Sequence, residues 1–439
     1  MSAALRSFEA QWRARTAEAR TADALQPLRE QAMQRFLKLG LPTMRDETWR
    51  YTDLRSVAAQ SFEAAPCEAR GAIDTNASLS LLDATQHAKT VVMINGCPSL
   101  KGNTSPINGI TISSIRELSR LDPKSMLRFF PPASDADQRR WVLLNTALFI
   151  DGLYLKITQR VTAPLVILHV STGDDAHQAA HPRIIIDAAP GSSATIIEHH
   201  VAHGEIVPLN NSNTHISLAR DAQLEHYRVY ATGAGASHLD SLDIHQAQGS
   251  QCKQFTIALG GGLVRSSMEA HLNEPGASLD SYSLLVGHED RHVDCVNIVT
   301  HAAPNTRSRQ TARAIASDVS RVIFNSKVIV NAGAVHADSQ QSCRGLLLSP
   351  NAEIDTRPQL EIHADEVKCA HGATTGRLDP DMLFYLLSRG LDRETAQSLL
   401  VYAFLADVLT GMSVSSARAA IENALISQLP DSQILRNFR

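Results

Sequence analysis

Short strand-like segments follow one another from about residue 153 to residue 375, and this run limits the fold more than any other feature of the chain. Examples are PLVILHV, ATIIEHH, LEHYRVYA, KQFTIAL and RVIFNSKVIV. They are rich in β-branched and aromatic residues, and several alternate between apolar and polar positions, as half-buried strands do. No amphipathic helix of ten or more residues interrupts them. The pattern therefore predicts a mainly β body.

Turns of one kind recur within this run. PGSSATI, RDAQLEHY, EPGASLDSY and SPNAEIDTR begin at residues 190, 220, 274 and 349, so that 30, 54 and 75 residues separate them. Each has a Gly, Asp or Asn, then an Ala or Ser, then alternating β residues. A repeated turn-and-strand unit without helices favours a β-solenoid, although a sandwich or barrel of many short strands stays open as an alternative.

Helical patterns lie on both sides of the β body. Residues 1 to about 40 contain few glycines and prolines and show helical spacing, and a further helix is expected around Trp141. Towards the C-terminus, Asp379 can N-cap a helix with Pro380 at its first position, and Gly390 can end it. We therefore divide the chain into a mixed helical region (1–150), a β core (151–375) and a C-terminal helical domain (376–439).

Two further C-terminal helices are predicted after Asp392. The first has its apolar face at Ala396, Leu399, Leu400, Ala403, Phe404 and Val408; the second spans 416–429, with Ala417, Ala420, Ile421, Ala424 and Leu425 on one face. A solenoid exposes unpaired strand edges at its ends. We expect these helices to cover part of one end, and any edge left over to be a docking surface.

Composition restricts the class of protein. The chain has 439 residues, 44% of them hydrophobic and 20% charged, and a net charge of −4 that argues against a nucleic-acid partner. The beginning of the chain has no apolar leader, and no run of about 18 apolar residues could span a bilayer. We expect a cytoplasmic location. The six cysteines contain no CxxC, so we expect no disulfide framework and mostly reduced, buried thiols.

The segment HEDRH, from His288 to His292, matches the HExxH pattern of zinc peptidases, with Glu289 as the base. That chemistry needs a helix, because imidazoles at i and i+4 converge on zinc only when one turn separates them. The flanking residues, VG before and VDCVNIVTH after, indicate strands instead. A polar strand face is therefore expected, and a zinc-dependent hydrolase using His288, Glu289 and His292 is kept as the alternative function.

Cys369 and His371 lie two residues apart on a predicted strand, so both side chains can point the same way. Thiolate and imidazole suit zinc, copper or an iron-sulfur cluster. Cys343 lies 26 residues earlier and would stack nearby if a solenoid turn has that length.

The sequence gives less support to two other kinds of site. The motif GxxxxGK[ST] of P-loop nucleotide binding and the nucleophile motif GxSxG are both absent. A carbohydrate-binding solenoid would need paired carboxylates along a groove, for which there is no pattern.

Three segments together resemble the SufB/SufD family of iron-sulfur cluster assembly proteins. GLPTMRDETWRYTDL is similar to the family's N-terminal signature and HVDCVNIVTHAAPNTRSRQ to its central segment. PQLEIHADEVKCAHGATTGRLDPDMLFYLLSRGL is very similar to its C-terminal signature. The resemblance implies a parallel β-helix core, which we expect to be right-handed, between N- and C-terminal helical regions.

The resemblance also implies partners and a role. The β-helix would dock against a SufB subunit, and the C-terminal helical domain would engage the ATPase SufC, to which the ATP site belongs. The chain itself would be a scaffold without turnover of its own. The histidine of the CxH element, implicated in forming a transient cluster shared with SufB, falls on His371, which we take as the metal-site residue. Cys369 is its less certain neighbour. No tightly bound cofactor is expected in the isolated chain, which could also form a homodimer.

The chain departs from the family pattern at two places. Ala312, Arg313 and Ala314 stand where the family usually has an aromatic residue and a Lys-Gly pair, which puts any role of those residues in doubt. Cys343 stands where one branch of the family commonly has a polar residue and the other carries its key cysteine. Our hypothesis is that Cys343 is an additional thiol near the cluster site.

Overall fold

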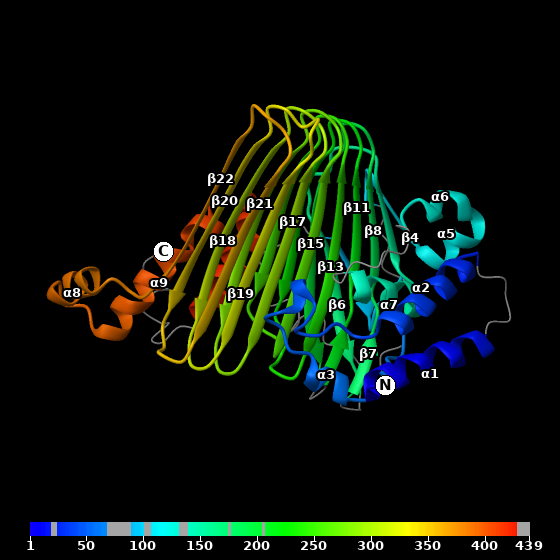
Figure 1. Cartoon of the computed structure of the whole chain (residues 1–439), viewed down its shortest axis with the longest axis horizontal. Coiled ribbons are helices and arrows are strands. Elements are labelled where there is room, and N and C mark those ends of the chain that lie inside the picture. Colours follow the sequence, from blue (N-terminus) through cyan, green and yellow to red (C-terminus); the bar gives the residue numbers. More distant parts are fainter. Residues whose placement is uncertain are drawn as a thin grey trace.

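A computed structural model describes residues 1–18, 24–67, 89–100, 107–130, 139–173, 177–203 and 207–427. Its centre is a parallel β-solenoid, as predicted, in which the chain passes alternately through two facing sheets (Figure 1). Sheet A has the order β21-β19-β17-β15-β13-β11-β8-β5-β4, and sheet B the order β22-β20-β18-β16-β14-β12-β9-β6-β2-β3. From β11 to β22, consecutive strands of the chain thus belong to different sheets, which excludes a sandwich of hairpins.

Helices occupy the two ends of the sequence and strands its middle. The helices are α1 (Ala3–Glu18), α2 (Gln26–Leu39), the short 3-10 helix η1 (Glu47–Trp49), α3 (Arg55–Ala59), α5 (Ile115–Leu121), α6 (Pro123–Leu127), α7 (Arg140–Leu148), α8 (Pro380–Ser388), α9 (Arg393–Leu409) and α10 (Ser415–Ser427). Sheet A and its side pairings contain β1 (Glu63–Ala64), β4 (Ile110–Ser114), β5 (Leu153–Ile157), β7 (His177–Ala180), β8 (Arg183–Ala188), β10 (Val207–Asn210), β11 (Asn213–Leu218), β13 (Ser237–Gln246), β15 (Leu263–Leu272), β17 (His292–His301), β19 (Arg321–Val330) and β21 (Glu353–Ile362). Sheet B contains β2 (Lys89–Ile94), β3 (Cys97–Pro98), β6 (Leu165–Thr172), β9 (Ser193–His203), β12 (Gln223–Tyr230), β14 (Gln251–Ala258), β16 (Ser278–Gly287), β18 (Arg307–Ala316), β20 (Asp338–Leu347) and β22 (Lys368–Gly376).

The turn that leads into each sheet B strand from β9 to β22 has one residue with positive φ, two positions before the strand. These residues are Gly191, Asp221, Gly249, Gly276, Asn305, His336 and Glu366. Three of the predicted repeats belong to this series, whereas SPNAEIDTR leads into β21 of sheet A. The spacing of 54 residues passes over the turn at Gly249, and the spacing of 75 passes over the turns at Asn305 and His336 and ends at a turn of the other sheet. Asn and, less often, other side chains can adopt the left-handed conformation that glycine adopts most easily.

The two ends of the solenoid differ. At the first end, β3 pairs antiparallel with β2 and β4 pairs antiparallel with β5, so both sheets close on short returning strands. At the other end, β21 and β22 are the outermost strands of their sheets, and nearly all their residues are only partly buried or exposed. The second end therefore presents two parallel strand edges without a strand beside them in the described residues.

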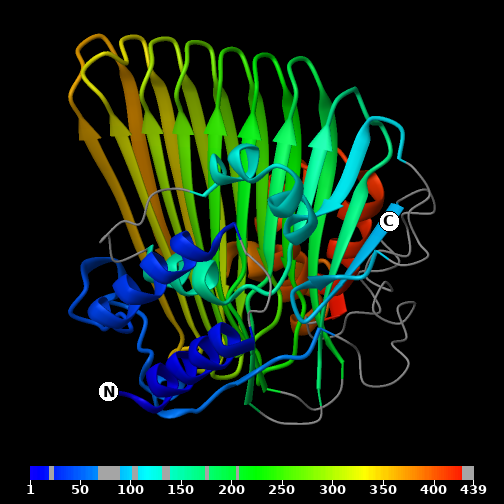
Figure 2. The same cartoon turned by 90° about the vertical axis from the view of Figure 1, so that its right-hand side faces the viewer.

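The helical regions cover the flanks of the solenoid, as two perpendicular views show (Figures 1 and 2). Helix α7 packs on β13 of sheet A, and α9 packs on β16 and β18 of sheet B. The prediction that the C-terminal helices cover the solenoid's end was therefore wrong. The outward face of sheet B carries the stacked rings of Tyr227, Phe255 and Tyr282. The C-terminal helices pack on these apolar rings instead of on the end of the solenoid.

The predicted helix boundaries in the C-terminal domain are confirmed, with Asp379 and Asp392 as N-caps. The predicted face of α9 was partly wrong, because Val401, Leu405 and Leu409 are buried while Ala403 is exposed. The helix is apolar over much of its circumference, so periodicity alone did not fix its orientation. The face of α10 is confirmed, and residues 428 and 429 of that prediction lie outside the described part of the chain.

Four cysteines are free, as expected, but Cys67 and Cys97 form a disulfide, contrary to the sequence-based expectation. Their thirty-residue separation gave no motif, and the contact depends on how β3 folds back beside the segment after β1. None of the described helices combines the length and the apolar character that a membrane crossing requires.

Candidate functional site

The predicted site residues lie on the last two strands of sheet B, at the open end. Strands β20 and β22 are parallel and in register, so that Ser339 is opposite Cys369, Gln341 opposite His371, and Cys343 opposite Ala373. Cys369 packs against the inner core of the solenoid. Because side chains alternate along a strand, His371 and Cys343 belong to the same inward series as Cys369.

Cys343 was predicted to lie near Cys369 on the assumption that one solenoid turn takes 26 residues. That length was wrong, although Cys343 still lies near His371. One turn of the solenoid here takes thirty residues, from Ser339 to Cys369, instead of the twenty-six that separate Cys343 from Cys369. Cys343 is therefore displaced by four positions from Cys369 and by two from His371. With strands 4.8 Å apart and a rise of 3.3 Å per residue, Cys343 and His371 are roughly 8 Å apart at the backbone.

His371 borders a shallow hollow of about 260 Å³ at the open edge. Its lining comes from the three outermost strands of sheet B: Arg309, Gln310, Thr311, Gln340, Gln341, Ser342, Ala370, His371 and Gly372. His371 is exposed because no further strand lies beside β22 in the described residues. The edge of β22 beside His371 is therefore open for groups supplied by another molecule.

The two thiols differ in accessibility. Cys343 is 2% exposed, and burial raises its pKa to about 12 although Arg313 acts in the opposite sense. Burial also raises the pKa of Cys369, which is less enclosed. Both thiols are thus protonated at neutral pH, and a metal ion would have to displace the proton to bind sulfur.

A column of polar side chains runs along the inside of sheet B and ends at His371. Its members are opposite one another from strand to strand: His226, Gln254, Ser281, Gln310, Gln341 and His371. Ser281 donates to Gln254 at 3.3 Å, and Ser326 from the facing sheet donates to Gln310 at 2.9 Å. The sequence-based prediction missed this column. If the sequence is aligned on the turn residues with positive φ, the residues of this column fall at one common position.

The HEDRH segment cannot form the predicted alternative site. His288 to Arg291 form the turn between β16 and β17, Glu289 has a positive φ of 56°, and β17 begins at His292. The polar strand face expected for this segment therefore begins only at His292, and the expectation was wrong for His288. Since the segment is also not helical, His288 and His292 do not have the one-turn arrangement that a zinc peptidase requires.

Helix α8 is the most exposed part of the C-terminal domain. None of its residues is buried, and it projects beyond the solenoid at the end that carries β22 (Figure 1). Met382, Phe384 and Tyr385 are 57%, 71% and 56% exposed. A group of large apolar side chains on one projecting helix is typical of a binding surface.

Comparison with known proteins gives two family matches that together span most of the chain. Residues 169–404 match the SUF system FeS cluster assembly SufBD core domain, and residues 8–167 match the SufBD protein N-terminal region. The chain is 29% identical to the iron-sulfur cluster assembly protein SufD of Escherichia coli, over 92% of this chain and 93% of that protein. It is 27% identical to a SufBD family protein of Synechocystis over 88% and 87%, and 24% identical to SufD of Bacillus subtilis over 72% of each.

Proposed function

The chain belongs to the SufBD family of the SUF system for iron-sulfur cluster assembly, as a homologue of SufD, and we propose that it is a scaffold subunit that works between two partners. One partner is a SufB-like subunit at the open end of the solenoid. The other is a SufC-like ATPase at the C-terminal helical domain. The chain itself carries no P-loop motif, so nucleotide turnover is assigned to the second partner.

The open strand edges support the first partner. β21 and β22 offer unpaired backbone groups that another β-solenoid can extend by strand addition. A SufB-like chain of the same family would present edges of the same kind. The isolated chain could also pair with a second copy through these edges until the partner replaces it.

The exposed apolar residues of α8 support the second partner. Helix α9 is anchored on sheet B by Val401, Leu405 and Leu409, so movement of a protein bound at α8 is transmitted to the solenoid. Nucleotide-driven closure of an ATPase dimer would thereby shift the two SufBD-family subunits against each other.

The observation that carries the proposed site is the position of the exposed His371 on β22, the outermost strand of sheet B. A partner strand beside β22 would bring its own ligands to the imidazole. His371 then serves as a ligand or proton carrier for the nascent cluster, which is the cargo of the system. Cys343 and Cys369 line the same inner face and are secondary candidates.

Co-expression of the chain with its SufB-like and SufC-like partners tests this proposal. The cluster is measured by absorption of the purified complex, after changing His371→Ala, Cys369→Ser and Cys343→Ser singly. We expect His371→Ala to lower the cluster yield at least tenfold while the complex still assembles. His177→Ala, an exposed imidazole on β7, is the matched control and should leave the yield unchanged. An unchanged yield for His371→Ala would refute the site assignment, and an unchanged yield for Cys343→Ser would exclude that thiol.

A further inference from the structure

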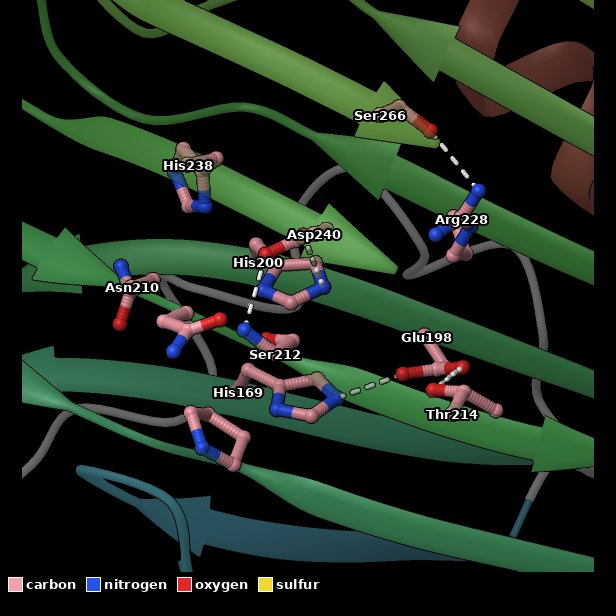
Figure 3. A network of polar contacts seen from close by, with 12 residues as sticks. His169, Glu198, His200, Asn210, Ser212, Thr214, Arg228, His238, Asp240 and Ser266 are labelled. Atoms are coloured by element: carbon pink, nitrogen blue, oxygen red, sulfur yellow. Dashed lines mark hydrogen bonds and ion pairs between the residues drawn. The ribbon is translucent and has the colours of Figure 1, made fainter. Parts of the chain in front are cut away.

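A second group of side chains of the types that can bind metal ions lies inside the solenoid, away from the open end. Histidines and carboxylates converge there from both sheets, as Figure 3 shows for His169, Glu198, His200, His238 and Asp240. His226 joins them through a contact with Glu198. The six side chains are at most 5% exposed. Buried groups of this kind need partners, because water does not solvate them.

Strand register explains how these residues meet. His200 on β9 is opposite His169 on β6, and their rings stack with centroids 4.2 Å apart. His238 and Asp240, two positions apart on β13, come from the facing sheet. Because the side chains of this group come from both sheets, no local sequence motif identifies the group.

The carboxylate of Glu198 already has its partners. It accepts hydrogen bonds from His226 Nε2 at 2.8 Å, from the Thr214 hydroxyl at 2.8 Å and from His169 Nε2 at 3.1 Å. These donors hold the pKa of Glu198 well below its usual range, against the effect of burial. Glu198 is therefore a satisfied carboxylate and a poor candidate for a vacant ligand.

The neighbouring group of His200, His238 and Asp240 is different, because each residue has a polar atom without a partner. Each residue also offers one ligand atom that lies within 4.8 Å of a ligand atom of the other two. His200 Nε2 and Asp240 Oδ2 are 3.9 Å apart, too far for a hydrogen bond. Neither atom, nor His238 Nδ1, has a hydrogen-bond partner in the described part of the chain.

The other polar atoms of two of these residues are fixed by hydrogen bonds. Thr232 Oγ1 is 3.0 Å from His238 Nε2, and the Ser212 backbone N–H donates to Asp240 Oδ1 at 3.1 Å. Metal ligands in proteins are commonly oriented by contacts of this kind to the atom that does not bind the metal. Two of the three side chains are thus fixed at one polar atom, while another polar atom of each has no partner.

We propose that His200, His238 and Asp240 form a binding site for one divalent transition-metal ion, with ferrous iron as the ion that this donor set indicates. Two imidazoles and one carboxylate are typical of non-haem Fe(II) sites, and hard-cation sites for magnesium or calcium use oxygen ligands instead. The site goes beyond the proposed function, because it lies within this chain and needs no ligand from a partner. We expect the ion to enter while the chain folds, since all three side chains are at most 2% exposed.

The test uses the full-length chain without any partner and with an affinity tag that contains no histidine. The chain is unfolded in urea and refolded anaerobically with Fe(II) or, in a second arm, Zn(II), then desalted and analysed for metal. The wild type is expected to retain about one Fe(II) per chain and to unfold at a higher temperature than the metal-free protein. Asp240→Asn and His238→Gln should each lower the retained iron about tenfold or more.

His199→Gln is the matched control. His199 is as buried as His200 but adjacent to it on β9, so it points to the opposite face of the strand, and its loss should leave iron binding intact. Absence of retained metal in the folded wild type would overturn the proposal, as would equal retention by Asp240→Asn. Retention of zinc without iron would reject the assignment to iron. Because no partner and no cluster enter the measurement, it can fail while the proposed function stands.

Discussion

The guanidinium group of Arg265 lies over the indole ring of Trp49, 3.8 Å from the ring centre. Arg265 is almost fully buried on β15, where it also pairs with Asp294 on β17 and donates to the carbonyl of Thr48 at 2.7 Å. The N-terminal segment is thus attached to sheet A by a cation that has three kinds of partner. Trp49 does more than fill space: it covers a buried ion pair.

Replacing Trp49 with alanine should therefore destabilise the chain by about 3–5 kcal/mol, because both the packing and the cover of the Arg265–Asp294 pair are lost. Urea-induced unfolding followed by circular dichroism measures the effect. Trp12, which is only partly buried on α1, provides the control, and Trp12→Ala should cost clearly less. Equal losses for the two variants would contradict an anchoring role of Trp49.

Proline at position 373 should prevent assembly at the open end without unfolding the chain. The N–H of Lys368 donates to Ala337, so alternate N–H groups of β22 face β20, and the N–H of Ala373 faces outward. Ala373→Pro removes a donor that only a partner strand would use. We expect co-purification with the SufB-like subunit and self-association of the isolated chain to be lost.

Ala373→Val keeps the backbone N–H and is the control for that experiment. It should assemble like the wild type, and both variants should unfold at nearly the same urea concentration. Assembly of the proline variant at wild-type affinity would show that β22 is not the edge that pairs.

A negative charge on α8 should weaken binding of the ATPase selectively. Phe384 is 71% exposed, so Phe384→Asp should change the free energy of unfolding by less than about 0.5 kcal/mol while lowering affinity at least tenfold. Titration calorimetry with the SufC-like subunit gives the affinity. Leu121→Asp is the matched control, since Leu121 is 74% exposed and terminates α5 at the opposite end of the molecule (Figure 1). Equal affinity of the two variants would argue against α8 as the docking surface.

The stability of the chain should fall as the pH is lowered from 7 to 5, in part because of His301. This buried imidazole lies 2.8 Å from both Thr306 Oγ1 and Ser308 Oγ, and burial lowers its pKa to about 4. The unfolded chain takes up a proton on His301 near pH 6.5 and the folded chain does not, so acid favours unfolding. The contribution is fully present above pH 6.5 and is lost progressively towards pH 4.

Between pH 7 and pH 5 this single group accounts for about 2 kcal/mol of lost stability. His301→Gln should therefore shrink the difference between the unfolding free energies at the two pH values by that amount, whatever it costs at pH 7. His177→Gln, at an exposed histidine, should leave the difference unchanged. A difference that is the same for His301→Gln and wild type would mean that His301 does not remain neutral in the folded state.

The sequence by itself determined the class of the fold and the order of its parts. Alternating β segments separated by turns, with no helix between them, allow few other arrangements, and the caps at Asp379 and Asp392 are local signals that depend on nearby backbone groups only. The placement of Cys369 and His371 on one strand face was also readable, because strand periodicity is local.

Only the tertiary structure decided which residues from different turns meet. The thirty-residue turn places Gln341, not Cys343, opposite His371, and the facing of two sheets brings His238 and Asp240 to His200. It also decided that α9 and α10 cover sheet B and leave β21 and β22 open. The physical reason is that register, the facing of sheets and helix docking depend on packing summed over distant segments, which no single stretch of sequence contains.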